Sequence, residues 1–289
     1  HVLVLSDGQA NEGERSASAL GHHAAELRNR KLTSSAIGIG ERYSQTQLRP
    51  IAEEGGGRLH DAQYLQEIVE VVAADLSGLI ETAMEQVEIS VKVPEGLEVE
   101  CLSAYGSKFA RGRLTVALGM LGHGKEKDAV FLVKLPEGKA GEVVGLEFRA
   151  KWRLAGEEAV GSAVLAVEIT FAPGNKNTAQ ERDDVVAMRV AEVWHANLML
   201  RAVELNRLGD YREAAEVLKG ELKRFERYAE GLPEGARLSA ELAQILRAVN
   251  WDWDERGRKE ITMCAFSLSR SEPDTRLNSR LPLYRYLPK

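Results

Sequence analysis

The chain has 289 residues, which is enough for two or three domains with buried cores. Its apolar content of 44% and charged content of 28% are those of an ordinary folded protein, so extensive disorder is excluded. The net charge of −6 argues against nucleic acid as the main ligand, and no apolar run reaches the roughly 18 residues of a membrane span.

Residues 1–84 alternate strand and helix patterns, which predicts an α/β layer with a parallel sheet. Val2–Leu5 reads as a buried central strand, Ser35–Ile39 as a second strand, and Arg58–His60 as a short edge strand. A helix is predicted after each strand, because apolar residues recur there at helical spacing. The three helical segments are Glu14–Arg30, the stretch from Gln45 to the glycines at 55–57, and Tyr64–Met84. Ser44 followed by Gln47 fits a capping box at the start of the second helix, and Pro50 is expected to kink that helix.

Residues 85–173 show a period of two, in which apolar and polar residues alternate along short runs. Turn sequences with proline and glycine separate these runs. Six or seven short strands at this spacing predict an antiparallel β-sandwich.

Residues 174–270 return to a helical period. Asp184–Leu208 and Tyr211–Ala229 are joined by Gly209-Asp210, which predicts a helical hairpin, and a third helix is expected from Glu234 to about Asn250. The first of these helices is apolar over a wide arc that includes Trp194, so we expect it to pack on the sandwich as well. Residues 271–289 are expected to form an extended tail, which carries a small basic cluster of Arg276, Arg280 and Arg285.

Three segments in chain order carry a resemblance to a known family. His1–Gly8, Ala36–Gly40, and Leu48–Gly57 with the following Arg58–His60 resemble the last strand and helix steps of von Willebrand factor A (vWA) domains. The sandwich and hairpin resemble the C-terminal extension of bacterial vWA proteins. The resemblance implies that these residues form the C-terminal half of a vWA domain. The N-terminal half would then come from the same gene product, a separate chain or a swapped copy.

The resemblance also implies a metal site. In vWA domains a divalent ion, Mg²⁺ or alternatively Ca²⁺ or Mn²⁺, lies at the carboxyl edge of the sheet and leaves a position open for a carboxylate of a protein partner. Asp7 matches the aspartate of the third metal motif, and the nearby binding residues would be Gly8, Gly40 and Glu41. The Asp-x-Ser-x-Ser and threonine motifs are absent, since Asp75-Leu76-Ser77-Gly78-Leu79 fails at its last position. We therefore expect the intact domain, and not this fragment alone, to bind the ion.

Three functions remain open from the sequence. The first is a non-catalytic, metal-dependent protein-binding module, and the second is a structural assembly protein with an incomplete or vestigial metal site, in which Asp7-Gly8 is only a turn. The third is a hydrolase, for which no pair of nucleophile and base and no cofactor motif can be found. His22 and His23 are neighbours on a helix and cannot share a metal, and Cys101 and Cys264 are interpreted as buried thiols. The cellular compartment stays open.

Overall fold

The computed structural model describes residues 1–10 and 12–271, and the predicted tail falls almost entirely outside them. The chain forms two compact units, His1–Gln180 and the residues from Glu181 onward. Within the described residues no helix is both long and apolar enough to cross a membrane.

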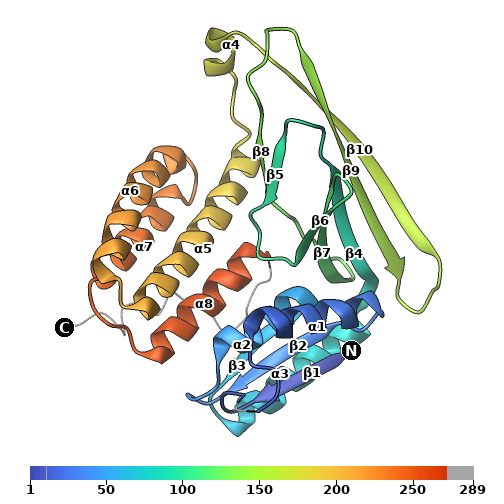
Figure 1. Cartoon of the computed structure of the whole chain (residues 1–289), viewed down its shortest axis with the longest axis vertical. Helices are drawn as coiled ribbons and strands as arrows, with labels where there is room; N and C mark the ends of the chain where they lie inside the picture. The colour runs from blue at the N-terminus through green and yellow to red at the C-terminus, as the bar shows by residue number, and fades with distance from the viewer. Residues whose placement is uncertain (11, 272–289) are drawn as a thin grey trace. The chain divides into compact units, whose positions relative to one another are not determined.

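The first unit opens with a parallel sheet of three strands and three helices. The elements are β1 (Val2–Ser6), α1 (Ala17–Asn29), β2 (Ser34–Ile39), α2 (Gln45–Gly55), β3 (Gly56–Ala62) and α3 (Leu65–Ile80). The strand order is β1-β2-β3, with parallel pairing throughout (Figure 1). Ala36 and Ile37 point to opposite faces of β2 and both are fully buried, so helices cover both faces of this strand. Val71 of α3 packs on Ile37 and Ala62. The predicted α/β fold class is confirmed.

The position of β1 differs from the prediction. Val2–Leu5 was predicted to be a buried central strand, but β1 is an edge strand whose pairing in the described residues is with β2 alone. Its residues are half-buried, and Leu5 is 49% exposed. A continuous apolar run is typical of a strand covered on both sides, and β1 lacks that cover here.

Two antiparallel sheets follow in the same unit. Their strands are β4 (Thr82–Lys92), β5 (Glu98–Cys101), β6 (Ser107–Ala110), β7 (Arg113–Gly122), β8 (Phe131–Lys134), β9 (Val143–Leu154) and β10 (Val160–Thr170). The larger sheet has the order β10-β9-β4-β7-β6, and β5 pairs with β8. Val91, Val116 and Leu146 of the larger sheet form a core against which Val99 and Phe131 of the smaller sheet pack. The two antiparallel sheets pack on each other through this core, and α4 (Gly174–Thr178) ends the unit.

The parallel and antiparallel layers meet through backbone contact. Gly56 ends α2 in a left-handed conformation, and a Cβ on Gly119 of β7 would lie 2.2 Å from the Gly56 carbonyl oxygen. Beside them Arg28 of α1 donates to the Glu54 carbonyl oxygen at 2.6 Å. Burial lowers the pKa of Arg28 and raises that of Glu54, although the attraction between their charges opposes both shifts. This close approach joins the two layers into one unit.

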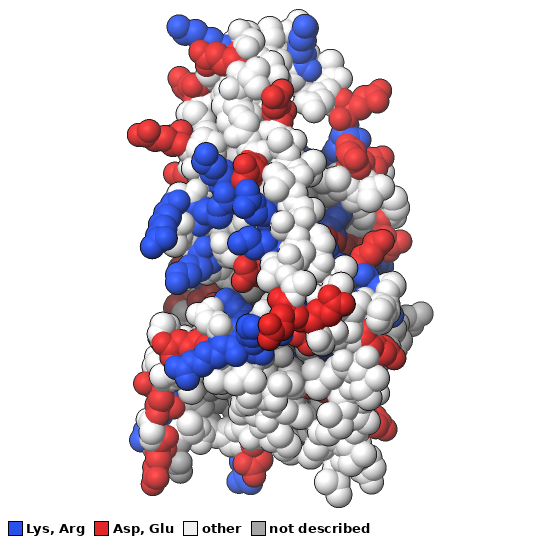
Figure 2. Space-filling view, turned by 90° about the vertical axis from the view of Figure 1, so that its right-hand side faces the viewer, with Lys and Arg blue, Asp and Glu red and all other residues white. Residues whose placement is uncertain are grey.

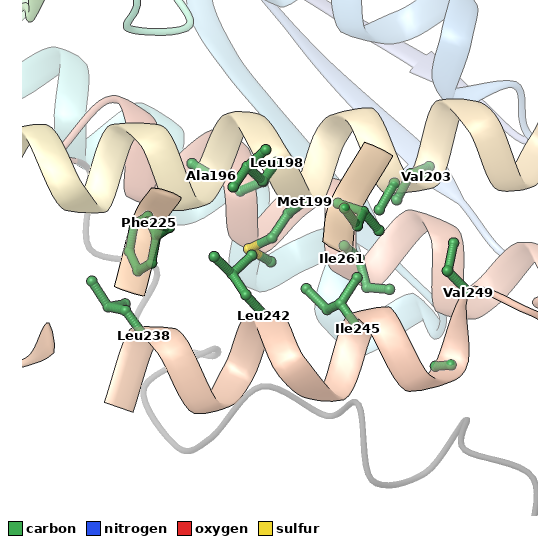
Figure 3. Packing of buried hydrophobic residues seen from close by; sticks show 14 of the residues in the cluster. Ala196, Leu198, Met199, Val203, Phe225, Leu238, Leu242, Ile245, Val249 and Ile261 are labelled. Atoms are coloured by element: carbon green, nitrogen blue, oxygen red, sulfur yellow. The ribbon is translucent and has the colours of Figure 1, made fainter. Parts of the chain in front are cut away.

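The second unit is a helical bundle. Its elements within the described residues are α5 (Asp184–Leu208), α6 (Tyr211–Ala229), α7 (Gly235–Ala248) and α8 (Glu255–Ser269). Figure 3 shows the core, in which Met199 of α5 lies among Leu242 and Ile245 of α7, with Phe225 of α6 and Ile261 of α8 nearby. The hairpin α5–α6 and helix α7 agree with the predicted helices, whereas α8 was not predicted. Because α6, α7 and α8 all pack on α5, the wide apolar arc of α5 is buried largely within this unit.

Candidate site at the carboxyl edge of the parallel sheet

Three loops converge at one edge of the parallel sheet. Gly38 of β2 is in register with Ser6 of β1 and Asp61 of β3, so the carboxyl ends of the three strands lie side by side. The loops that leave them contain Ser6-Asp7-Gly8, Gly40–Ser44, and the residues after Asp61. Ligand sites of open α/β sheets lie at this edge.

Backbone hydrogen bonds hold the first two loops together. The Gly8 carbonyl oxygen accepts from the Ser44 amide at 3.2 Å and from the Ser6 hydroxyl at 3.0 Å. The Gly40 amide in turn donates to the Ala62 carbonyl oxygen at 2.7 Å, which links the second loop to β3. The three loop ends are therefore connected in a chain of hydrogen bonds across the edge.

Gln47 adds a side-chain bridge between these loops. Its Oε1 accepts from the Ala10 amide at 3.1 Å, and its Nε2 donates to the Arg15 carbonyl oxygen at 3.1 Å. Ser44 is the N-cap residue of α2, but its side chain makes no capping bond and its hydroxyl lies 2.9 Å from that of Thr46. The predicted capping box is therefore wrong, because the Gln47 amide group is used to fix the loop after β1.

A buried tyrosine, Tyr43, and a partly buried aspartate, Asp61, are joined by a hydrogen bond at this edge. Tyr43 is 2% exposed, and its hydroxyl donates to Asp61 Oδ1 at 2.6 Å. The ring lies on Gly38, where a Cβ would come within 2.2 Å of it. Neither residue was predicted from the sequence. The signal available was that Asp61 directly follows the predicted strand Arg58–His60.

The four predicted site residues lie at this edge, but they differ in how exposed they are. Asp7 and Glu41 are exposed, while Gly8 and Gly40 are half-buried. Gly40 has a φ of 69°, which favours glycine and turns the chain sharply after β2. The loop of Asp7 and Gly8 is thus beside the loop of Gly40 and Glu41, as the shared edge requires.

The residues at this edge do not complete a metal site by themselves. A hard cation such as Mg²⁺ takes about six oxygen ligands, several of which are waters. Asp7 and Glu41 are the two exposed carboxylates at this edge, and Asp61 is held by Tyr43. Across the described ranges 1–10 and 12–271, no group of three or more His, Cys, Asp and Glu side chains could hold a metal ion. The donor set of these described residues therefore does not fit the ion without added ligands.

A second polar cluster lies between α3 and the sheet. The Asp75 carboxylate of α3 is 2.8 Å from His1 Nε2, 3.5 Å from the Ser35 hydroxyl and 3.7 Å from His60 Nε2. Ser35 is fully buried and also accepts from the Arg58 amide at 3.1 Å. These contacts tie α3 to residues of the sheet and of the segment before β1.

Comparison with known proteins shows similarity of fold to two solved structures. No protein-family model matches the chain, and no curated protein matches it. A solved von Willebrand factor type A structure from Catenulispora acidiphila aligns over 91% of this chain with a TM-score of 0.62 and 14% identity. The ArnB paralog VWA2 from Sulfolobus acidocaldarius aligns over 93% with a TM-score of 0.56 and 18% identity. The chain spans 64% and 63% of the lengths of these proteins, so each contains more residues than the part that aligns.

Proposed function

We propose that this chain forms part of a non-catalytic, metal-dependent protein-binding module of the vWA type. The observation that carries the proposal is the exposed carboxylate of Asp7 on a loop that hydrogen bonds fix beside the Gly40–Ser44 loop. The similarity of fold to the two vWA structures supports the proposal, because ligands of open α/β sheets bind at the carboxyl edge on which Asp7 lies. A metal held there would present a positive charge, and the matching partner group is a carboxylate of another protein.

The missing metal ligands would come from further α/β elements on the free side of β1. Leu5 of that strand is half exposed, and α3 carries an exposed apolar stripe made of Leu65, Val69, Leu76 and Ile80. A parallel strand with an open edge and an uncovered helix face is what a larger sheet would bury. The additional length of the two similar proteins is consistent with such elements. The same gene product, a separate chain or a swapped copy could supply them.

A titration with Mn²⁺ tests the metal proposal on the chain together with the α/β elements that complete its sheet. We expect Asp7→Asn to weaken Mn²⁺ binding by roughly tenfold or more, because loss of one carboxylate next to a divalent ion costs over about 1.4 kcal/mol. The matched control is Asp210→Asn, which changes an exposed aspartate in the helical unit and should leave binding unchanged. Equal Mn²⁺ affinity in the wild type and Asp7→Asn would show that Asp7 is not a ligand, and no Mn²⁺ binding by the wild type would favour the second candidate, a structural assembly protein with a vestigial metal site.

A further inference from the structure

The strand β10 is a long sheet edge without the usual protection. β10 pairs with β9 over all 11 of its residues, and in the described part of the chain β9 is its only strand partner. About half of its backbone amide and carbonyl groups therefore face the open side. The opposite edge, β6, has four residues and contains Lys108, so it is short and charged. β10 contains no proline, and its one charged residue is Glu168.

The centre of β10 is apolar and exposed on both faces. Ala163, Val164, Leu165 and Ala166 are consecutive exposed residues, and Val164 is 55% and Leu165 64% exposed. The pairing of β10 with β9 continues without a bulge, whereas β4 has several register shifts. A long, regular and apolar edge is a template for pairing with another strand, and natural proteins cover such edges. Figure 2 looks onto the side where β9 and β10 lie and shows a strip of uncharged surface beside a group of basic side chains.

We propose that β10 is the dimer interface of this protein, in which it pairs antiparallel with β10 of a second copy across a two-fold axis through Leu165. A two-fold axis perpendicular to the sheet places the same face of both copies on the same side. Even-numbered residues of β10 then lie opposite even-numbered residues of the second copy, and odd-numbered opposite odd-numbered. Leu165 then meets the second copy's Leu165, and Val164 meets the second copy's Ala166. The two five-stranded sheets become one sheet of ten strands, and the apolar edge is buried.

Charge and polarity favour this register. Glu168 lies opposite the second copy's Ser162, which can donate a hydrogen bond to the carboxylate. In each copy Lys151 of β9 is in register with Ser162, so it lies about 10 Å across the sheet from the second copy's Glu168. A register centred on Val164 would place Glu168 opposite Val160 instead. No pair of like charges faces across the axis through Leu165.

This inference is independent of the metal proposal, because it does not involve Asp7 or the parallel sheet. Sedimentation velocity of the 289-residue chain from about 1 to 100 µM, the range of moderate protein affinities, should show a species of twice the 31.8 kDa chain mass. Leu165→Lys and Leu165→Glu should each give monomers, because two like charges would oppose each other at the axis. An equal mixture of the two variants should restore the dimer, because lysine then faces glutamate. The control is Phe109→Lys on the opposite edge strand β6, which should remain dimeric.

Circular dichroism checks that both variants are folded. Because Leu165 is exposed, each variant should retain the wild-type spectrum. A wild-type chain that stays monomeric throughout would overturn the proposal and would leave β10 to a strand of another protein. Dimers that persist in both single variants would also overturn it. If both variants are folded monomers and their mixture stays monomeric, the axis through Leu165 is wrong.

Discussion

Close backbone approach makes particular glycines irreplaceable, and Gly119 is the clearest case. Its φ is 79°, and an added Cβ would lie 2.2 Å from the Gly56 carbonyl oxygen, which belongs to the backbone and cannot turn aside. Gly112 has a similar φ of 70° with no atom within 4 Å of an added Cβ. A side chain at Gly112 would meet only the strain of the positive φ, whereas a side chain at Gly119 would also clash with the backbone.

We therefore predict that Gly119→Ala destabilises the first unit far more than Gly112→Ala. The left-handed conformation costs roughly 1–2 kcal/mol for alanine at either position. The clash at Gly119 adds the cost of separating the parallel and antiparallel layers, so its loss should exceed that of Gly112→Ala by about 2 kcal/mol or more. Urea unfolding of both variants measures the difference, and equal losses would show that the two layers are not held in contact at this point.

His195 is a polar residue in the core of the helical unit. It is fully buried, both ring nitrogens lack a hydrogen bond, and Nε2 lies 3.4 Å from Glu241 Oε2. Burial, with a smaller effect of Arg237, lowers the pKa of His195 to about 3. The folded state thus holds the neutral ring, while the unfolded chain takes up a proton near pH 6.5.

This difference predicts acid sensitivity. The contribution of His195 to stability is complete above about pH 6.5 and is lost as the pH falls toward 3, at about 1.4 kcal/mol per pH unit. Burial raises the pKa of Glu241, which acts in the opposite direction, so the comparison must be between variants. His195→Leu should lose less unfolding free energy between pH 7 and 4.5 than the wild type, as measured by chemical denaturation. The exposed His23→Leu should behave like the wild type.

At the scale of elements, Asn206 of α5 fixes the connection between α7 and α8. Its Nδ2 donates to the Trp251 carbonyl oxygen at 2.7 Å, and its Oδ1 accepts from the Trp253 amide and from Arg258 Nε, each at 3.2 Å. The residue itself is fully buried. One side chain thus satisfies the backbone of a turn that is distant in sequence.

Asn206→Ala should destabilise the helical unit by about 2–4 kcal/mol, because the buried amide of Trp253 and the partly buried carbonyl group of Trp251 lose this partner. Asn250→Ala, at an exposed position in the turn that Asn206 holds, should change stability by less than about 0.5 kcal/mol. Thermal unfolding followed by circular dichroism compares the two. A small loss for Asn206→Ala would mean that water replaces its hydrogen bonds.

The elements that were predicted from the sequence are those in which apolar residues recur at a regular spacing from end to end. The bounds of α5 and α6 and the alternating strands β4 and β9 follow directly from their apolar spacing. Helix α8 was missed because Gly257 and Lys259 occupy buried positions, so its apolar face is not continuous in sequence. At the candidate site, Asp7 was predicted from the resemblance to vWA domains, and its place near Gly40 from the shared edge of parallel strands. Tyr43 and Gln47 act through contacts across loops that no local pattern reveals.

At the scale of the whole molecule, the surface of the first unit has an exposed apolar stripe that its own described elements leave uncovered. Leu65, Val69, Leu76 and Ile80 recur at helical spacing along α3, and Ile80 is 85% exposed. The buried side of the same helix is held by Asp75 and Val71. Helix α3 is therefore apolar on two sides, as a helix between a sheet and a further layer would be.

The stripe predicts that the 289-residue chain binds a hydrophobic dye in its folded state. Val69→Ser combined with Ile80→Ser should lower the dye fluorescence clearly, with little change in unfolding free energy because both side chains are exposed. Val185→Ser, at an exposed valine in the helical unit, is the control and should leave the fluorescence unchanged. Addition of the α/β elements that complete the sheet should lower the wild-type signal to the level of the double variant. Undiminished fluorescence of the double variant would place the dye elsewhere and would remove the main support for a covering layer on α3.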